Sequence, residues 1–226
     1  MVRSKNAKDM VENAVGGAGR YCLEEHAVFT PDGYILIVHR LCFKKKPSDG
    51  DDNGVFGNGL FEKRVKCGKA PPVLLNHGSM MTSEVWLAAP TRSVAGDEKI
   101  PCTLPHVLLH AGYDVWLANR RGNKYSCKHT NLHTASNEFW SFSLDEPAIR
   151  DLPAVIDYIC AETEFPSISI IGFSQGSAET LGSLAMVKSL NRKVNLAILL
   201  APTTKPKGKK AFLAKLISND MFSIRI

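Results

Sequence analysis

The sequence has no apolar run long enough to cross a bilayer. A membrane-spanning helix needs roughly 20 apolar residues, and no stretch of this chain comes near that length. The mean hydropathy of −0.09 also excludes a polytopic membrane protein. The first residues are basic but are followed by no apolar segment. We therefore expect no signal peptide, and no membrane anchor within this chain.

Cysteine pairs at metal-binding spacing are absent too. The six cysteines are scattered along the chain: Cys22, Cys42, Cys67, Cys102, Cys127 and Cys160. This spacing argues against a zinc site and against a disulfide scaffold. We expect thiols in or near a core in a reducing compartment, although isolated disulfides stay open. The 226 residues, 44% of them hydrophobic, suffice for one domain with its own core.

Acidic residues are outnumbered by basic ones, which gives a formal net charge of +6. Much of the excess lies in two clusters, Lys44–Lys46 and Lys205–Lys210. Solvated loop charge is the favoured interpretation, and attraction to an anionic lipid surface is the alternative. No aromatic stacking pattern accompanies the lysines, so we expect no nucleic-acid partner.

Strand-like and helix-like segments alternate along most of the chain. Two strands, 25–30 and 34–40, flank the turn Pro31-Asp32-Gly33 and predict a hairpin. Further strands are predicted at 72–76, 114–118, 168–171 and 196–200, and helices at 104–111, 147–162 and 175–190. This order predicts a mixed, mostly parallel sheet with helices on both faces. Residues 44–71 read as a surface loop.

The pentapeptide Gly172-Phe173-Ser174-Gln175-Gly176 follows one of these strands and precedes a helix. That context is the one required for the nucleophile elbow of a serine hydrolase, with Ser174 as the nucleophile. Gly172 and Gly176 would let the tight turn pack without Cβ clashes. A tight strand–helix turn without chemistry is the alternative.

A second loop, Asn76-His77-Gly78-Ser79, directly follows the strand 72–76. Such a loop supplies one backbone donor of an oxyanion hole, and the residue after the nucleophile supplies the other. We expect the N–H groups of Ser79 and Gln175 in these roles, each worth about 3 kcal/mol in the transition state. We expect the His77 imidazole to fix the loop structurally rather than to act chemically.

The sequence resembles the acid lipases, which include gastric, lysosomal and fungal steryl ester hydrolases. It looks most like the fungal branch of this family. The resemblance covers roughly residues 21–210. It rests on segments that occur in the same order: EHAVFTPDGYILIVHR, HGSMMTSEVW, GYDVWLANRRGNKYS, FWSFSLDE, LPAVIDY, IGFSQG and the stretch 191–202 with the following KPKG. One departure is Ser79-Met80, where the family usually has two leucines; a backbone donor survives that change.

The resemblance implies the α/β-hydrolase fold and hydrolysis of lipid esters, namely steryl esters and triacylglycerols. Ser174 would form an acyl-enzyme that water releases. No cofactor or metal is implied. The resemblance and the basic clusters favour work at a membrane or lipid-droplet surface on the cytoplasmic side, with a secreted or lysosomal enzyme as the alternative. It says nothing about the oligomeric state.

The sequence has no histidine after Ser174, and only Glu179 and Asp220 are acidic there. In this fold the order along the chain is serine, acid, histidine. We therefore expect residues 21–201 to form the N-terminal part of the core, lacking the last strands and most of the cap. Residues 1–20 would be poorly ordered, and 202–226 would begin the cap or form an unrelated tail.

Without its base, the chain alone should have little or no esterase activity. Two alternative functions stay open: a non-catalytic lipid-binding or regulatory remnant of the fold, and a different hydrolase activity such as a thioesterase.

Overall fold

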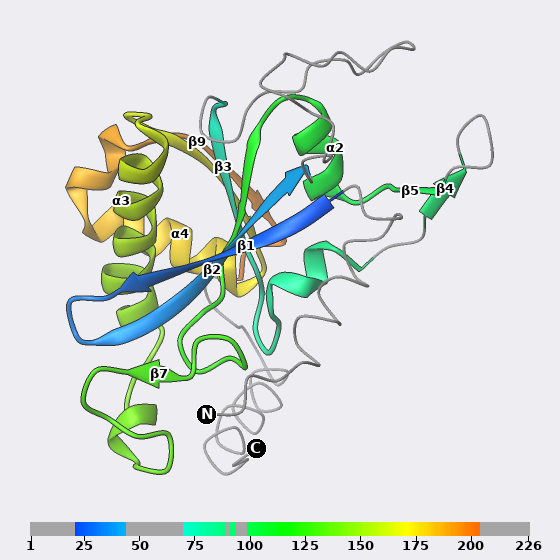
Figure 1. Ribbon diagram of the computed structural model, residues 1–226. Helices are drawn as coiled ribbons and strands as arrows, with labels where there is room; N and C mark the ends of the chain where they lie inside the picture. Colours follow the sequence, from blue (N-terminus) through cyan, green and yellow to red (C-terminus); the bar gives the residue numbers. More distant parts are fainter. Residues whose placement is uncertain (1–20, 44–69, 89–90, 94–98, 204–226) are drawn as a thin grey trace, which may run out of the picture.

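The computed structural model describes residues 21–43, 70–88, 91–93 and 99–203 (Figure 1). Several predicted features lie outside these residues: the segment 1–20, most of the loop 44–71, Cys67, both lysine clusters and the tail 204–226. Within the described residues, no helix is long and apolar enough to cross a membrane.

The chain opens with the predicted hairpin, formed by β1 (Tyr21–Phe29) and β2 (Tyr34–Phe43). The turn closes through two backbone bonds, from Gly33 N–H to the Thr30 carbonyl at 3.0 Å and from Thr30 N–H to the Tyr34 carbonyl at 2.9 Å. Gly33 has a φ of 96°, a conformation that disfavours any side chain.

The main sheet has the strand order β1-β2-β6-β3-β8-β9, and the short β7 (Lys128–His129) also pairs with β2. The other strands are β3 (Pro72–Asn76), β6 (Asp114–Leu117), β8 (Ile168–Phe173) and β9 (Val194–Leu200). β6, β3, β8 and β9 are parallel, whereas β1 and β2 are antiparallel. The predicted mixed, mostly parallel sheet is therefore confirmed. A separate two-stranded sheet pairs β4 (Thr91–Ser93) with β5 (Lys99–Pro101).

Helices cover both faces of the sheet, as Figure 1 shows: α3 (Leu152–Thr163) and α4 (Gln175–Met186) on one face, and α2 (Leu104–His110) on the other. Short helical turns lie at η1 (Ser83–Trp86), η2 (Glu138–Trp140) and η4 (Lys188–Arg192). Successive side chains of β3 point to opposite faces of the sheet and so contribute to both core clusters. Val73 and Leu75 join the cluster on the α2 side, while Leu74 joins the cluster on the α3 side.

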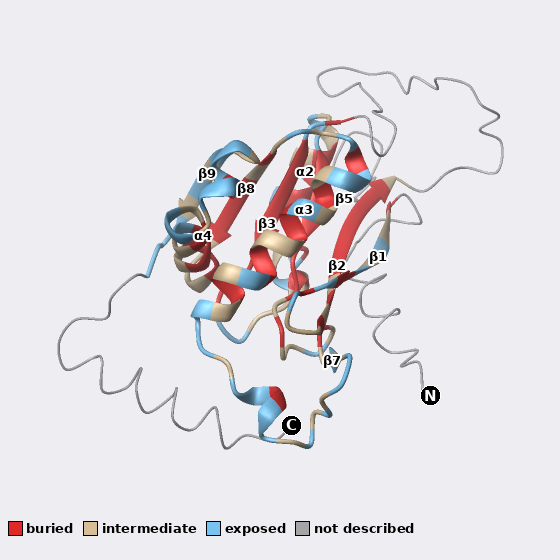
Figure 2. Ribbon diagram, turned by 90° about the vertical axis from the view of Figure 1, so that its left-hand side faces the viewer, coloured by how far each residue is buried: buried red, intermediate tan, exposed pale blue. Residues whose placement is uncertain are grey.

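Several boundaries differ from the prediction. The hairpin strands span Tyr21–Phe29 and Tyr34–Phe43 rather than 25–30 and 34–40. The segment 147–162 begins with a π-helical turn, η3 (Pro147–Asp151), before α3 starts. The helix 175–190 ends at Met186 and is followed by η4. The strand predicted at 196–200 begins at Val194. It is the last in the strand order, and Leu196, Ile198 and Leu200 are exposed (Figure 2).

Candidate active site at the carboxyl ends of the parallel strands

Ser174 connects the end of β8 to the first residue of α4. Its φ of 51° and ψ of −113° lie in a region that non-glycine residues rarely occupy. Backbone bonds hold this conformation on both sides. Ser174 N–H donates to the Leu200 carbonyl of β9 at 2.8 Å, and the Ser174 carbonyl accepts from Ser177 N–H at 3.1 Å. A serine held in a strained strand–helix turn has the geometry of a nucleophile elbow.

The two flanking glycines lie where no side chain fits. A Cβ on Gly172 would come within 2.8 Å of the Ser177 Cα and 2.9 Å of the Gly176 carbonyl oxygen. A Cβ on Gly176 would lie 2.3 Å from the Asn76 carbonyl oxygen and 2.6 Å from that of His77. The start of α4 therefore packs directly against the backbone that follows β3. This close approach brings the second predicted loop beside Ser174.

The loop after β3 passes next to Ser174. A Cβ on Gly78 would lie 3.2 Å from the Ser174 Cβ. The Ser79 hydroxyl donates a hydrogen bond to the side-chain carbonyl of Gln175. Gln175 is the first residue of α4, where a backbone N–H has no partner within the helix. The structure thus brings together Ser79, Gln175 and Ser174, the three residues to which the sequence assigns chemistry.

His77 is buried, and both of its ring nitrogens are engaged. Nε2 accepts from the backbone N–H of Arg120 at 3.3 Å, so Nδ1 carries the proton and donates to the Gly78 carbonyl at 2.8 Å. Burial, together with the nearby Arg120 charge, lowers the pKa of His77 to about 4. The ring is therefore neutral and held in place, which supports a structural role and leaves it unable to act as the base.

A buried ion pair lies behind the elbow. Arg120 Nε is 2.6 Å from Oε1 of Glu179 on α4, and Asn76 Nδ2 donates to Glu179 Oε2 at 3.2 Å. Burial raises the pKa of Glu179, and the Arg120 charge and the Asn76 hydrogen bond oppose that rise. Sequence reasoning gave Arg120 no role, although it lies in the segment GYDVWLANRRGN. Glu179 is one of the two acidic residues after Ser174, and its carboxylate is bound in this pair.

The next residue, Arg121, anchors a second buried cluster. Its guanidinium donates to the carboxylates of Asp32, in the hairpin turn, and of Asp151, at the end of η3. It also lies 3.9 Å from the centre of the Tyr34 ring. These contacts tie the hairpin to the start of α3 and hold the segment 119–123 that carries Arg120. No local sequence pattern indicates this cluster beyond the arginine pair itself.

Two other buried histidines are bonded elsewhere: His39 Nδ1 lies 2.7 Å from Ser83 Oγ, and His106 Nδ1 lies 2.6 Å from Thr103 Oγ1. In the part of the chain that the structure describes, no three His, Cys, Asp or Glu side chains gather as metal ligands would. Among the described cysteines, Cys42 is buried and Cys102 is exposed.

Comparison with known families agrees with this architecture. Residues 71–215 match the family described as alpha/beta hydrolase fold, and residues 18–89 match the partial alpha/beta-hydrolase lipase region. The chain therefore belongs to the alpha/beta hydrolase family, in its acid lipase branch.

Individual relatives point to the same branch. A probable lipase of Schizosaccharomyces pombe is 41% identical over 188 residues, which are 83% of this chain and 36% of that protein. The lysosomal acid lipase/cholesteryl ester hydrolase of Macaca fascicularis is 32% identical over 205 residues, 88% of this chain and 45% of that protein. The chain thus spans less than half the length of these relatives.

Among solved structures, the chain resembles naproxen esterase from Bacillus subtilis, with a TM-score of 0.50 and 15% identity. The match covers 96% of this chain and 56% of the esterase. At this identity the likeness concerns the fold alone.

Proposed function

We propose that the chain carries the nucleophile half of a serine hydrolase that cleaves lipid esters, namely steryl esters and triacylglycerols. Ser174 Oγ attacks the ester carbonyl, and the backbone N–H groups of Ser79 and Gln175 stabilise the oxyanion. The alcohol leaves, and water then releases the fatty acid from the acyl-enzyme. The observation that carries this proposal is the strained backbone of Ser174 beside the loop of Gly78 and Ser79. The name of the macaque relative, a lysosomal acid lipase/cholesteryl ester hydrolase, supports the substrate class.

Ser174 needs a base that these 226 residues do not offer. All seven histidines precede it, and His77, in the oxyanion loop, has both ring nitrogens occupied. In the proposal, the histidine and its acid come from residues beyond this sequence. The chain alone would retain only the weak assistance of an oxyanion hole and substrate binding.

Reading the transcript past Ile226 tests this proposal most economically. A continuing frame that supplies an aspartate and a histidine in strand–loop context would support it. The longer product should then hydrolyse emulsified triolein and cholesteryl oleate, and Ser174→Ala should abolish both activities. A longer product with the acid and base in place but without esterase activity would overturn the proposal.

A non-catalytic lipid-binding or regulatory protein is the second candidate. It predicts a stop directly after Ile226. It also predicts that Ser174→Ala leaves binding to phosphatidylcholine vesicles containing cholesteryl oleate unchanged, and that the serine reacts no faster than a surface serine.

We further propose that the protein acts at a membrane or lipid-droplet surface on the cytoplasmic side. The name of the lysosomal relative fits the alternative, a secreted or lysosomal enzyme. A fluorescent fusion of the gene product separates the outcomes. Signal confined to the soluble cytosol would count against both, and signal in lysosomes or the medium would select the alternative.

A further inference from the structure

Three side chains connect the loop after β3 to the first turns of α4 beneath Ser174. They are Asn76 at the end of β3, Arg120 in the loop after β6, and Glu179 on α4. All three are largely buried, and the Glu179 side chain is only 4% exposed. A carboxylate this deeply buried is costly to desolvate and is retained only where its partners compensate.

The partners of Glu179 reach the two segments that would hold the oxyanion. Asn76 Nδ2 donates both to Glu179 Oε2 at 3.2 Å and to the Gly176 carbonyl at 3.3 Å. Arg120, paired with Glu179, donates from its backbone N–H to His77 Nε2 at 3.3 Å and from Nη2 to the His77 carbonyl at 3.4 Å. His77 in turn donates to the Gly78 carbonyl. The Glu179 carboxylate is therefore linked to both segments that meet at Gly176. It reaches the start of α4 through Asn76 and the loop after β3 through Arg120.

The geometry of the Arg120–Glu179 pair indicates a role in positioning the loop rather than in stabilising the fold. Arg120 Nε and Glu179 Oε1 are 2.6 Å apart, yet neither atom makes a well-directed hydrogen bond. Buried ion pairs contribute little net stability, and imperfect ones contribute less. A cavity of about 20 Å³ lined by Asn76, Arg120 and Glu179 borders the pair, so the Arg120 side chain has space beside it if the pair is lost.

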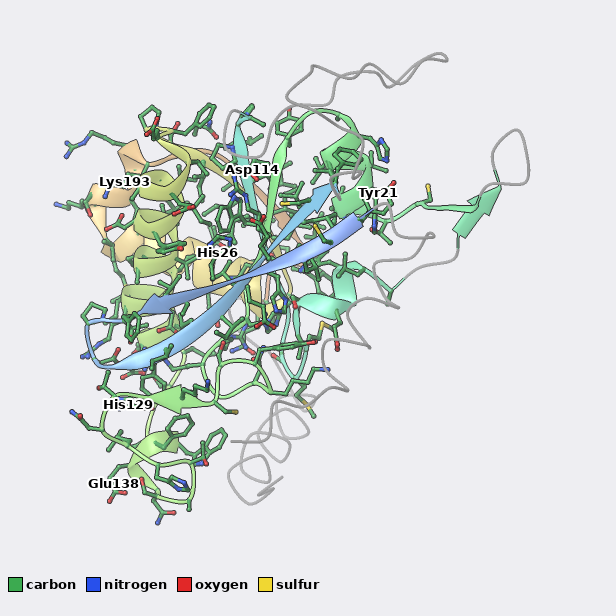
Figure 3. All side chains as sticks on the ribbon, viewed as in Figure 1. Tyr21, His26, Asp114, His129, Glu138 and Lys193 are labelled. Atoms are coloured by element: carbon green, nitrogen blue, oxygen red, sulfur yellow. The ribbon has the colours of Figure 1, made fainter. Side chains whose placement is uncertain are left out.

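The chain contains a matched buried pair whose role differs. Arg40 donates twice to Asp114, each time at 2.8 Å, and Trp116 donates to the same carboxylate. Asp114 begins β6 (Figure 3). It therefore lies at the opposite end of the parallel strands from Ser174, which follows β8. Burial and charge are similar at both pairs, but only the pair of Glu179 contacts the loop beside the elbow.

We propose that Glu179 is a positioning residue. Through Arg120 and Asn76, it holds the His77–Ser79 loop in register with Gln175, so that both backbone donors point to one oxyanion position at Ser174. The inference rests on the proposed function of these donors. Glu179 itself touches no reacting atom.

The test measures covalent labelling of Ser174 by a fluorophosphonate, in which Ser174 Oγ bonds to phosphorus and fluoride leaves. Glu179→Gln keeps the size and the bond to Asn76 but removes the charge that orders Arg120. We expect the maximal labelling rate to fall about tenfold with an unchanged half-saturating probe concentration, because donors displaced by tenths of an ångström stabilise charge less well. Arg120→Lys should give the same pattern.

Asp114→Asn is the control. It should lower the melting temperature at least as much as Glu179→Gln while Ser174 is labelled at the parent rate. Equal labelling rates in the parent and in folded Glu179→Gln would overturn the proposal and leave Glu179 a structural residue.

A second readout does not depend on chemistry at Ser174. Hydrogen–deuterium exchange of residues 76–81 should accelerate in Glu179→Gln and stay at the parent rate in Asp114→Asn. Exchange unchanged in both variants would refute the positioning role even if the parent is never labelled. A parent that resists labelling while Glu179→Gln still loosens the loop would keep the positioning role. The proposed function would then fail only if the longer product, with its acid and base in place, also showed no esterase activity.

Discussion

At the scale of single residues, the backbone conformations at residues 172–176 position Ser174. Ser174 has a positive φ, and Gly172 and Gly176 have backbone atoms within 3 Å of where a Cβ would stand. Positive φ at a non-glycine residue costs of the order of 1–3 kcal/mol and persists where the surroundings enforce it. Here the surroundings are the Leu200 carbonyl on one side and the β3 loop on the other.

Gly176→Ala should therefore destabilise the protein severely. The new Cβ would clash with two carbonyl oxygens that belong to the backbone and cannot swing aside. We expect a loss of about 3 kcal/mol or more in the free energy of unfolding, measured by urea denaturation. Gly182→Ala, on the same helix, meets only the Ala148 Cβ at 3.2 Å and should stay within about 1 kcal/mol of the parent. Equal losses in the two variants would contradict the close contact at Gly176.

His77 should make stability depend on pH. Its pKa is lowered to about 4 in the folded protein, below the usual value of 6.5, so the unfolded chain binds a proton that the folded one does not. Stability contributed by the neutral ring is complete above pH 6.5 and decreases as the pH falls toward 4. Between pH 7 and pH 5 the loss amounts to about 2 kcal/mol.

Comparison of the parent with His77→Gln isolates this effect from the carboxylates, which titrate in both proteins. Urea unfolding at pH 7 and pH 5 should show the smaller pH dependence in the variant. The same dependence in both proteins would mean that His77 is not held neutral.

At the scale of elements, β9 ends the sheet with an apolar stripe. Leu196, Ile198 and Leu200 share one face and are 40–53% exposed, and none of the described residues covers them. An exposed apolar edge strand is a site for aggregation. The stripe lies on the α2 side of the sheet, because Ile198 pairs with Ile171 of that core cluster.

Ile198→Lys should slow aggregation of this chain, followed by light scattering, and change the free energy of unfolding by less than about 1 kcal/mol. Leu199→Lys places the same charge on the half-buried opposite face, where it should destabilise by about 1–3 kcal/mol. Unchanged aggregation in Ile198→Lys would mean that a surface other than β9 causes the aggregation.

Sequence patterns predicted the elements far better than their connections. The Pro31-Asp32-Gly33 turn and the short apolar runs have local physical causes, and each produced the predicted hairpin or strand. The π-helical turn at 147–151 and the short β7 have no such periodic signature. The Arg120–Glu179 pair joins residues 59 positions apart, and the partners of Arg121 are at least 30 positions away from it. Only the folded chain brings these residues together.

The same limit applies to the site. Gly-Phe-Ser-Gln-Gly and Asn-His-Gly-Ser are local patterns, so the sequence could predict Ser174, Ser79 and Gln175. That Ser79 lies against Gln175 follows from the parallel register of β3 and β8, in which Asn76 stands opposite Gly172. The engagement of both His77 nitrogens could not be read from the sequence, because Arg120 comes from another strand's loop.

At the scale of the whole molecule, this chain spans only 36–46% of the curated relatives it matches. The matched part contains the sheet, Ser174 and the loop after β3 that is proposed to stabilise the oxyanion. The proposed chemistry divides accordingly, with the nucleophile and its backbone donors here and the base and acid in the remainder.

The most direct test of the central claim is fluorophosphonate labelling of this chain, followed by peptide mapping of the modified serine. We predict slow modification of Ser174, far below the rate of an intact acid lipase, and none at this peptide in Ser174→Ala. Modification that shows no preference for Ser174 over exposed serines such as Ser143 would contradict its assignment as the nucleophile. A rate equal to that of an intact lipase would contradict the need for a base from outside these residues.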